Sequence, residues 1–183
     1  MKIIEGDILD VKEGIIVHGC NCQGVMGSGV AKAIRDKYPE VFTAYSKLWI
    51  QRSSLTLGQT QFCISEEYSG AKPEGFEIWS VGNSLPKDLV IVNAMTQYGY
   101  GKTGEQFVDY NAMKACFSMV RGFAEHTKLP VYFPLIGCGL GGGDWSEVCG
   151  IIENCLEGLD RTLVLNAQTK AKLKAETPLV KFQ

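Results

Sequence analysis

Short apolar runs alternate with amphipathic stretches along the chain, and this alternation predicts strands and helices in turn. Runs that end at glycine or polar residues predict strands at 2–6, 14–19, 59–65, 76–84, 88–95, 129–137 and 161–166. The run 88–95 is apolar enough for the centre of a sheet. Apolar positions at helical spacing predict helices at 28–49, 108–127 and 144–159.

For two of the predicted helices the sequence also predicts a break and a core face. Pro39 should interrupt the stretch 28–49, because proline disfavours helical backbone in the residue before it. The core face of the helix 108–127 is predicted at Tyr110, Met113, Ala115 or Cys116, Phe117 and Val120. Strands that alternate with helices predict a layered α/β fold with helices on both faces of the sheet. In such folds ligands bind at the carboxyl ends of the strands.

The chain of 183 residues is long enough for one domain with a substantial core, which we expect over residues 1–166. Residues 167–183 are largely polar, and the sequence leaves open whether this C-terminal tail packs on the domain. Apolar residues make up 45% of the chain, which predicts an ordered globular protein. The formal net charge of −2 gives no basic excess for sequence-independent binding to nucleic acid.

Cysteines and apolar runs indicate the compartment. Seven cysteines without a disulfide-scaffold spacing favour a reducing, intracellular location. The N-terminus has no apolar signal core, and no apolar run approaches the roughly 20 residues of a membrane span. Cys20 and Cys22 stand one residue apart, which is not a zinc spacing. We therefore expect them to be small buried residues at a strand end, and we expect no metal and no cofactor.

Two glycine-rich loops carry the main chemical signal. The loop 24–32 (GVMGSGVAK) and the loop 136–145 (IGCGLGGGDW) each follow a predicted strand and lead into a predicted helix. Free backbone N–H groups and helix dipoles at such places favour an anion. Two such loops in one small domain can hold a diphosphate from opposite sides.

Neither loop fits a common nucleotide-binding motif. Gly137, Gly139 and Gly142 satisfy G-x-G-x-x-G, but the next strand ends in Asn166 instead of an acid, and too little chain remains for a Rossmann domain. The loop 24–32 lacks the G-K-[S/T] ending of a Walker A motif. A kinase or NTPase is therefore not expected.

His18 and Asp144 are the side chains beside the loops that can carry chemistry. His18 can act as general acid or base or can pack in the core, and the neighbouring loop favours the functional role. Asp144 suits an N-cap and a catalytic carboxylate equally well, because D-x-x-E at 144–147 resembles a capping box. Packing roles are preferred for Cys138 and Trp145, and a helix-end surface position for His126.

These motifs, in this order, resemble the macro domain family, whose members bind ADP-ribose. The resemblance runs through GDI at 6–8, VHGCN at 17–21, MGSGVA at 26–31, PLIGCGLGGGDW at 134–145 and TLVLN at 162–166. It covers roughly residues 1–166 and implies a three-layer α/β/α fold with a mixed central sheet.

The resemblance also implies where ADP-ribose binds. Asp7 would hydrogen-bond the adenine amino group beside the Ile8 backbone, and Asn21 would contact the distal ribose. The first loop would wrap the distal ribose and pyrophosphate through Gly27, Ser28, Gly29 and Val30. The second loop would donate to the pyrophosphate from the backbone of Gly137, Cys138, Gly139, Leu140 and Gly141.

The family contains readers of ADP-ribose, hydrolases that remove ADP-ribose from protein or nucleic acid, and phosphatases of ADP-ribose 1″-phosphate. Several hydrolases carry N-A-A-N where this chain has H-G-C-N. A histidine at this place resembles the phosphatase branch, which pairs it with a carboxylate, for which Asp144 is the candidate. A branch that cleaves glutamate esters relies on a lysine after the central strand and an aspartate after G-C-G-L. This chain has Met95, Thr96 and Gln97 at the first place and Gly141 at the second, with Lys102 displaced by several residues.

We therefore predict a monomeric, cytoplasmic macro domain that hydrolyses ADP-ribose 1″-phosphate to ADP-ribose and phosphate, with His18 and Asp144 as the catalytic residues. The alternatives are a hydrolase that removes ADP-ribose from protein or nucleic acid, and a reader without activity. The expected partner is a small-molecule ADP-ribose derivative or an ADP-ribosylated macromolecule, with no membrane partner and no strong nucleic-acid signal.

Overall fold

A computed structural model describes residues 1–101 and 105–176, with side chains up to Lys174. The first half of the chain forms β1 (Lys2–Glu5), the short 3-10 helix η1 (Ile8–Asp10), β2 (Gly14–Asn21), α1 (Gly29–Lys37), α2 (Pro39–Arg52), β3 (Thr60–Ile64) and β4 (Ile78–Ser80). The second half forms β5 (Leu89–Gln97), α3 (Tyr110–Thr127), β6 (Val131–Phe133), α4 (Trp145–Cys155), β7 (Arg161–Leu165) and α5 (Ala167–Glu176). The predicted strands and helices are confirmed, and Pro39 separates α1 from α2 as expected.

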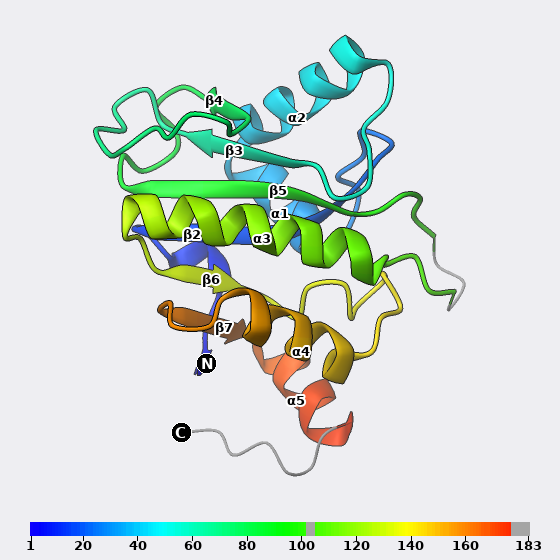
Figure 1. The fold of residues 1–183 in the computed structure, drawn as a ribbon. Helices are drawn as coiled ribbons and strands as arrows, with labels where there is room; N and C mark the ends of the chain where they lie inside the picture. Colours follow the sequence, from blue (N-terminus) through cyan, green and yellow to red (C-terminus); the bar gives the residue numbers. More distant parts are fainter. Residues whose placement is uncertain (102–104, 177–183) are drawn as a thin grey trace.

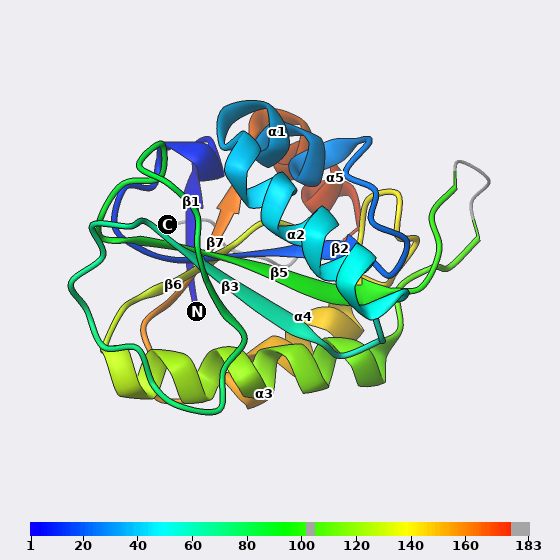
Figure 2. The same ribbon diagram turned by 90° about the horizontal axis from the view of Figure 1, so that it is seen from above.

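The described strands form one mixed sheet in the order β1-β7-β6-β2-β5-β3-β4. Neighbouring strands are parallel except for β5 and β3, which are antiparallel. Helices α1 and α2 cover one face of the sheet, and α3 and α4 cover the other (Figure 1, Figure 2). The predicted three-layer α/β/α architecture is confirmed. In the part of the chain described here, no helix has the length and apolar character needed to cross a membrane.

Strand β2 shows how the sequence is divided between the two faces. Ile15 and Val17 belong to the core that includes α3 and α4, whereas Ile16 belongs to the core that includes α1 and α2. Because successive strand residues point to opposite faces, His18 and Cys20 point with Ile16 toward α1 and α2. Burial on both faces explains why this strand lacks a polar alternation.

A chain of buried polar side chains crosses three strands and ends on α2. Nε2 of His18 lies 2.6 Å from Oδ1 of Asn93 on β5. Nδ2 of Asn93 donates to Oε1 of Gln61 on β3 at 2.8 Å, and Nε2 of Gln61 donates to the carbonyl of Ala44 at 3.0 Å. Because the amide nitrogen of Asn93 donates to Gln61, the amide oxygen of Asn93 must face His18. The ring proton of His18 therefore lies on Nε2, which donates to that oxygen.

Helix α5 lies in the polar stretch after Asn166, for which the sequence pattern supports no firm prediction. Its Leu173 is fully buried in the core that includes α3 and α4. Lys170 pairs with Glu5, the last residue of β1, and Lys172 donates to the carbonyl of Cys138 in the second glycine loop. The helix therefore contacts both the end of β1 and the second loop.

The buried His18 predicts a pH dependence of stability. Burial lowers its pKa to about 4, against about 6.5 in the unfolded chain. Between these values the unfolded chain binds a proton that the folded chain does not, so the free energy of unfolding falls as the pH drops from about 6.5 to 4, by up to about 3 kcal/mol. Urea unfolding near pH 7 and near pH 5 should show a loss of about 2 kcal/mol in the wild type that His18→Gln lacks.

The matched control is His126→Gln, because His126 is exposed near the end of α3. This variant should keep the pH dependence of the wild type. An equal loss of stability in the wild type and in His18→Gln would contradict the assignment of the effect to His18.

Candidate functional site

The segments that the sequence assigns to ligand binding follow three strands of the sheet. Asp7 and Ile8 come after β1, residues 21–30 begin at the end of β2, and residues 137–141 come after β6. Strands β1, β7, β6 and β2 run parallel, so their carboxyl ends meet at one edge. Three strand spacings, about 14 Å, separate β1 from β2. A ligand that touches both ends must therefore be extended.

The second glycine loop is folded so that several backbone donors stay open. Gly137 has a φ of +74°, and its carbonyl accepts from the N–H of Gly143 at 2.9 Å, which closes the loop. A Cβ at Gly141 would lie 2.6 Å from the carbonyl oxygen of Gly137, so only glycine fits there. Within the described residues, no hydrogen bond uses the N–H groups of Gly139, Leu140 or Gly141.

Cys138 differs from its neighbours in this loop. Its N–H donates to the carbonyl of Leu135 at 3.2 Å, and its side chain is buried in the core. The preferred packing role of the thiol is therefore confirmed. The backbone donation predicted for Cys138 would have to compete with the bond to Leu135.

The first loop is organised by the side chain of Asn21. Its Oδ1 accepts from the N–H groups of Gln23 at 2.9 Å and Val25 at 3.3 Å, and its Nδ2 donates to the carbonyl of Val25 at 2.7 Å. Ser28 then occupies the N-cap of α1 without a side-chain hydrogen bond. In the described structure no hydrogen bond uses the N–H groups of Gly27, Ser28, Gly29 and Val30. The amino end of α1 is therefore open to an anion.

Asp7 stands at the other end of the same edge. Its carboxylate is exposed, and Oδ1 accepts from the N–H of Leu9 at 2.9 Å, which caps η1. The hydrogen bonds of the described residues leave Oδ2 unused, so this oxygen can accept from a ligand. Ile8 beside it is buried.

The structure does not bring His18 and Asp144 together. His18 has no exposed surface and points toward the face that α2 covers, and its Nε2 donates to Oδ1 of Asn93 on β5. Asp144 is exposed and begins α4, which covers the opposite face of the sheet (Figure 2). Catalysis by this pair stays a prediction, and of the two side chains only that of Asp144 reaches solvent.

The N-cap role of Asp144 is confirmed. Its Oδ1 accepts from the N–H groups of Ser146 at 2.7 Å and Glu147 at 3.3 Å. The Ser146 hydroxyl and these N–H groups lower the pKa of the Asp144 carboxyl, so it is ionised at neutral pH. Oδ2 takes part in none of these bonds.

The remaining candidates are placed as follows. Cys20, Cys22 and Trp145 are buried, and His126 is exposed, as predicted. Gln97, the last of the three residues 95–97 in the region where the ester-cleaving branch has a lysine, donates from Nε2 to the carbonyl of Gly99 at 2.8 Å. Lys102 lies outside the described residues. The described residues contain no group of three or more His, Cys, Asp or Glu that could hold a metal ion.

Sequence reasoning missed three residues that shape this edge. Asn93 and Gln61 hold His18 in its orientation, and the hydroxyl of Tyr45 donates to the carbonyl of Asn21 at 2.5 Å. A polar residue inside an apolar strand was the available signal for Asn93. Tyr45 gave no local signal, because its partner comes from a different element.

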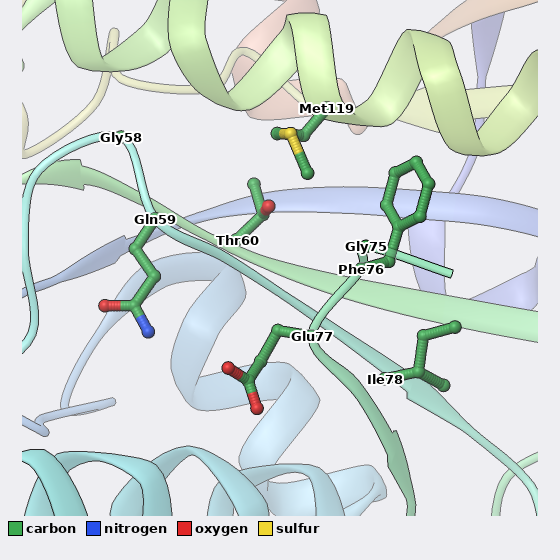
Figure 3. A pocket seen from close by; sticks show the side chains of 8 residues that line it. All are labelled: Gly58, Gln59, Thr60, Gly75, Phe76, Glu77, Ile78 and Met119. Atoms are coloured by element: carbon green, nitrogen blue, oxygen red, sulfur yellow. The ribbon is translucent and has the colours of Figure 1, made fainter. Parts of the chain in front are cut away.

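A separate hollow of about 500 Å³ lies on the flank of the sheet, between α3 and the segment that leads into β4 (Figure 3). It is lined by Gly58, Gln59, Thr60, Gly75, Phe76, Glu77, Ile78 and Met119. The carboxylate of Glu77 pairs with Arg52 and accepts from Nε1 of Trp79 at 2.9 Å. None of the predicted ligand-binding residues lines this hollow. Its charged side chain, Glu77, is already engaged by Arg52 and Trp79.

Comparison with known proteins agrees with the family that the motifs resemble and with the observed architecture. The profile of the Macro domain family matches residues 17–72. An uncharacterised 17.5 kDa protein of Enterobacteria phage T4 is 30% identical over 169 residues, which cover 90% of this chain and 95% of the relative. The macrodomain of Mycobacterium tuberculosis DarG has the same fold, with a TM-score of 0.65 at 23% identity, and the match covers 89% of this chain and 95% of that one.

Two relatives with assigned activities match over shorter parts of their length. A DNA ADP-ribosyl glycohydrolase of M. tuberculosis is 28% identical over 144 residues, which cover 78% of this chain and 35% of the relative. An ADP-ribose 1″-phosphate phosphatase of Aspergillus fumigatus is 51% identical over 43 residues, which cover 23% of this chain and 22% of the relative. Both names describe processing of ADP-ribose derivatives. With the family profile, the full-length relative and the shared fold in agreement, this chain belongs to the macro domain family.

Proposed function

We propose that this chain binds ADP-ribose along the carboxyl edge of its sheet and hydrolyses ADP-ribose 1″-phosphate. The observation that carries the proposal is the pair of loops with open backbone donors that follow β2 and β6 at the same edge. The N–H groups of residues 27–30 and 139–141 face no protein acceptor in the described structure. Backbone N–H groups of this kind hold phosphates without lysines.

The extended ligand suits the spacing of the segments. Adenine would lie at Asp7 and Ile8 after β1, where Oδ2 of Asp7 can accept from its amino group. The diphosphate would lie between the two loops, and the distal ribose would lie at Asn21 after β2. Because the protein already carries a net charge of −2, oriented N–H dipoles supply the attraction that a basic surface would otherwise give.

The reaction needs an attacking water and protonation of the ribose oxygen. Water attacks phosphorus, the bond from phosphorus to the 1″-oxygen breaks, and that oxygen takes up a proton. Oδ2 of Asp144 is available to orient the water, since Oδ1 holds the amino end of α4. His18 is enclosed by the sheet and α2, so we assign it a positioning role through β2, three residues before Asn21.

A second candidate function is removal of ADP-ribose from a modified macromolecule. The similarity to the DNA ADP-ribosyl glycohydrolase extends over 144 residues, whereas that to the phosphatase extends over 43. Met95, Thr96 and Gln97 stand in the region where the ester-cleaving branch has a lysine, and Gly141 stands where that branch has an aspartate. Such an activity would therefore use other residues than that branch does.

The first prediction concerns Asp144. Asn is also a good N-cap, so Asp144→Asn should keep α4 intact while it removes the charge. Phosphate release from ADP-ribose 1″-phosphate should fall at least about tenfold, while the Kd for ADP-ribose stays within about twofold of the wild type.

Asp109→Asn is the matched control, because Asp109 caps α3 through the N–H of Ala112 at 2.7 Å in the same way. It should leave phosphate release unchanged. Full turnover in Asp144→Asn would reduce Asp144 to a cap and contradict its catalytic role.

The second prediction concerns the second loop. A methyl group at position 141 would collide with the carbonyl of Gly137, so Gly141→Ala must distort the loop that presents the open donors. Calorimetric titration should show ADP-ribose binding weakened by at least about tenfold. Gly150→Ala on α4 is the control, since a Cβ there meets nothing within 4 Å. Unchanged affinity in Gly141→Ala would place the diphosphate elsewhere.

The third prediction separates the two candidate functions. The wild type, with and without chelator, is given ADP-ribose 1″-phosphate, ADP-ribosylated single-stranded DNA and ADP-ribosylated protein. We expect phosphate release from the first substrate that resists the chelator. Release of free ADP-ribose from either macromolecule, with no phosphate release, would favour the second candidate. Tight ADP-ribose binding without turnover of any substrate would leave a reader.

A further inference from the structure

Tyr45 lies beneath the first loop, although it belongs to α2 and stands 24 residues after Asn21. Its side chain is fully buried among the apolar residues that support the loop, including Met26 and Leu48. Its hydroxyl donates to the carbonyl of Asn21 at 2.5 Å and lies 3.1 Å from Oδ1 of the same residue. One hydroxyl therefore reaches both the backbone and the side chain of Asn21.

The contacts of Asn21 fix the orientation of its amide. Oδ1 accepts from the N–H groups of Gln23 and Val25, so the oxygen must face the loop. Nδ2 gives one hydrogen to the carbonyl of Val25, and no hydrogen bond among the described residues uses the second. An amide nitrogen carries two hydrogens. Toward a ligand, Asn21 can therefore act only as a donor, through the second hydrogen of Nδ2.

The position of α2 is itself fixed, so Tyr45 cannot readily shift. The carbonyl of Ala44, the preceding residue, accepts from Nε2 of Gln61 in the chain of polar side chains that starts at His18. That bond ties α2 to the sheet directly before Tyr45. The hydroxyl of Tyr45, held in place in this way, in turn holds the carbonyl of Asn21 at the end of β2.

We infer that Tyr45 is a positioning residue that sets the Asn21 amide as a donor to a hydroxyl of the distal ribose, and thereby separates ADP-ribose from ADP. The inference rests on the proposed function, which places the distal ribose at Asn21. Without the hydroxyl, the backbone carbonyl of Asn21 loses its donor, and Oδ1 loses the polar contact at 3.1 Å. The end of β2 and the amide that it carries can then shift together, and the second hydrogen of Nδ2 no longer points at the ligand.

The test compares two ligands in one variant. Tyr45→Phe keeps the ring and removes only the hydroxyl, and calorimetric titration gives the Kd values for ADP-ribose and for ADP, which lacks the distal ribose. ADP-ribose binding should weaken about tenfold, while ADP binding stays within about twofold. A residue that only packs would change both affinities by the same factor.

Tyr68→Phe is the matched control, because Tyr68 is also buried but belongs to the core on the other face of the sheet. It should change neither affinity. A wild type that does not bind ADP-ribose overturns the proposed function and this inference together. A wild type that binds, with a Tyr45→Phe variant whose two affinities change equally, overturns the role of Tyr45 alone.

A second measurement uses the wild-type chain and does not depend on the folding of a variant. The side-chain amide signals of Asn21 in a nitrogen–proton correlation spectrum should shift when ADP-ribose is added and stay in place when ADP is added. Signals that respond equally to both ligands would overturn the inference. Thermal unfolding of Tyr45→Phe shows separately whether the variant remains folded at the temperature of the titration.

Discussion

The arrangement of this domain depends on the pairing of polar groups in the middle of an apolar sheet. A buried donor or acceptor without a partner costs about 1–3 kcal/mol, so His18, Asn93 and Gln61 must meet one another when the strands pair. That requirement is met when β2, β5 and β3 lie in the observed register and α2 presents the carbonyl of Ala44. The interaction therefore fixes the centre of the sheet and the helix that supports the first loop.

The site follows from this centre and from parallel pairing. Parallel strands place their carboxyl ends at one edge, so loops far apart in the sequence become neighbours there. The second loop keeps its N–H groups open because glycine allows the close approach of its own backbone, as at Gly141. The first loop keeps its shape because Asn21 occupies the donors and acceptors of residues 23–25. A protein with a net charge of −2 can therefore offer an anion site made of backbone.

Local patterns were sufficient for the elements and for several side chains. The strand and helix alternation, the break at Pro39 and the cap at Asp144 each depend on residues close together in the sequence. The orientation of His18 does not, since it depends on which face of β2 meets α2 and on Asn93, which lies 75 residues further along the chain. Asn93 is in turn held by Gln61, which donates to the carbonyl of Ala44 on α2. The engaged N–H of Cys138 and the packing of α5 against the second loop likewise arise only in three dimensions.

A division between backbone groups that bind and side chains that react agrees with the different activities that the names of two relatives describe. In the proposed binding mode the diphosphate is held by backbone N–H groups, which most substitutions leave unchanged, so this part of the ligand can be held while the side chains around it differ. On this proposal, the chemistry at the distal ribose would depend on the few side chains at the ends of β2 and β5 and at the start of α4. In this chain these are Asn21, Gln97 and Asp144. Fold similarity alone cannot assign the reaction, because it reports on the backbone, whereas in the proposed site the reaction would be decided by those three side chains and by the buried groups that orient them.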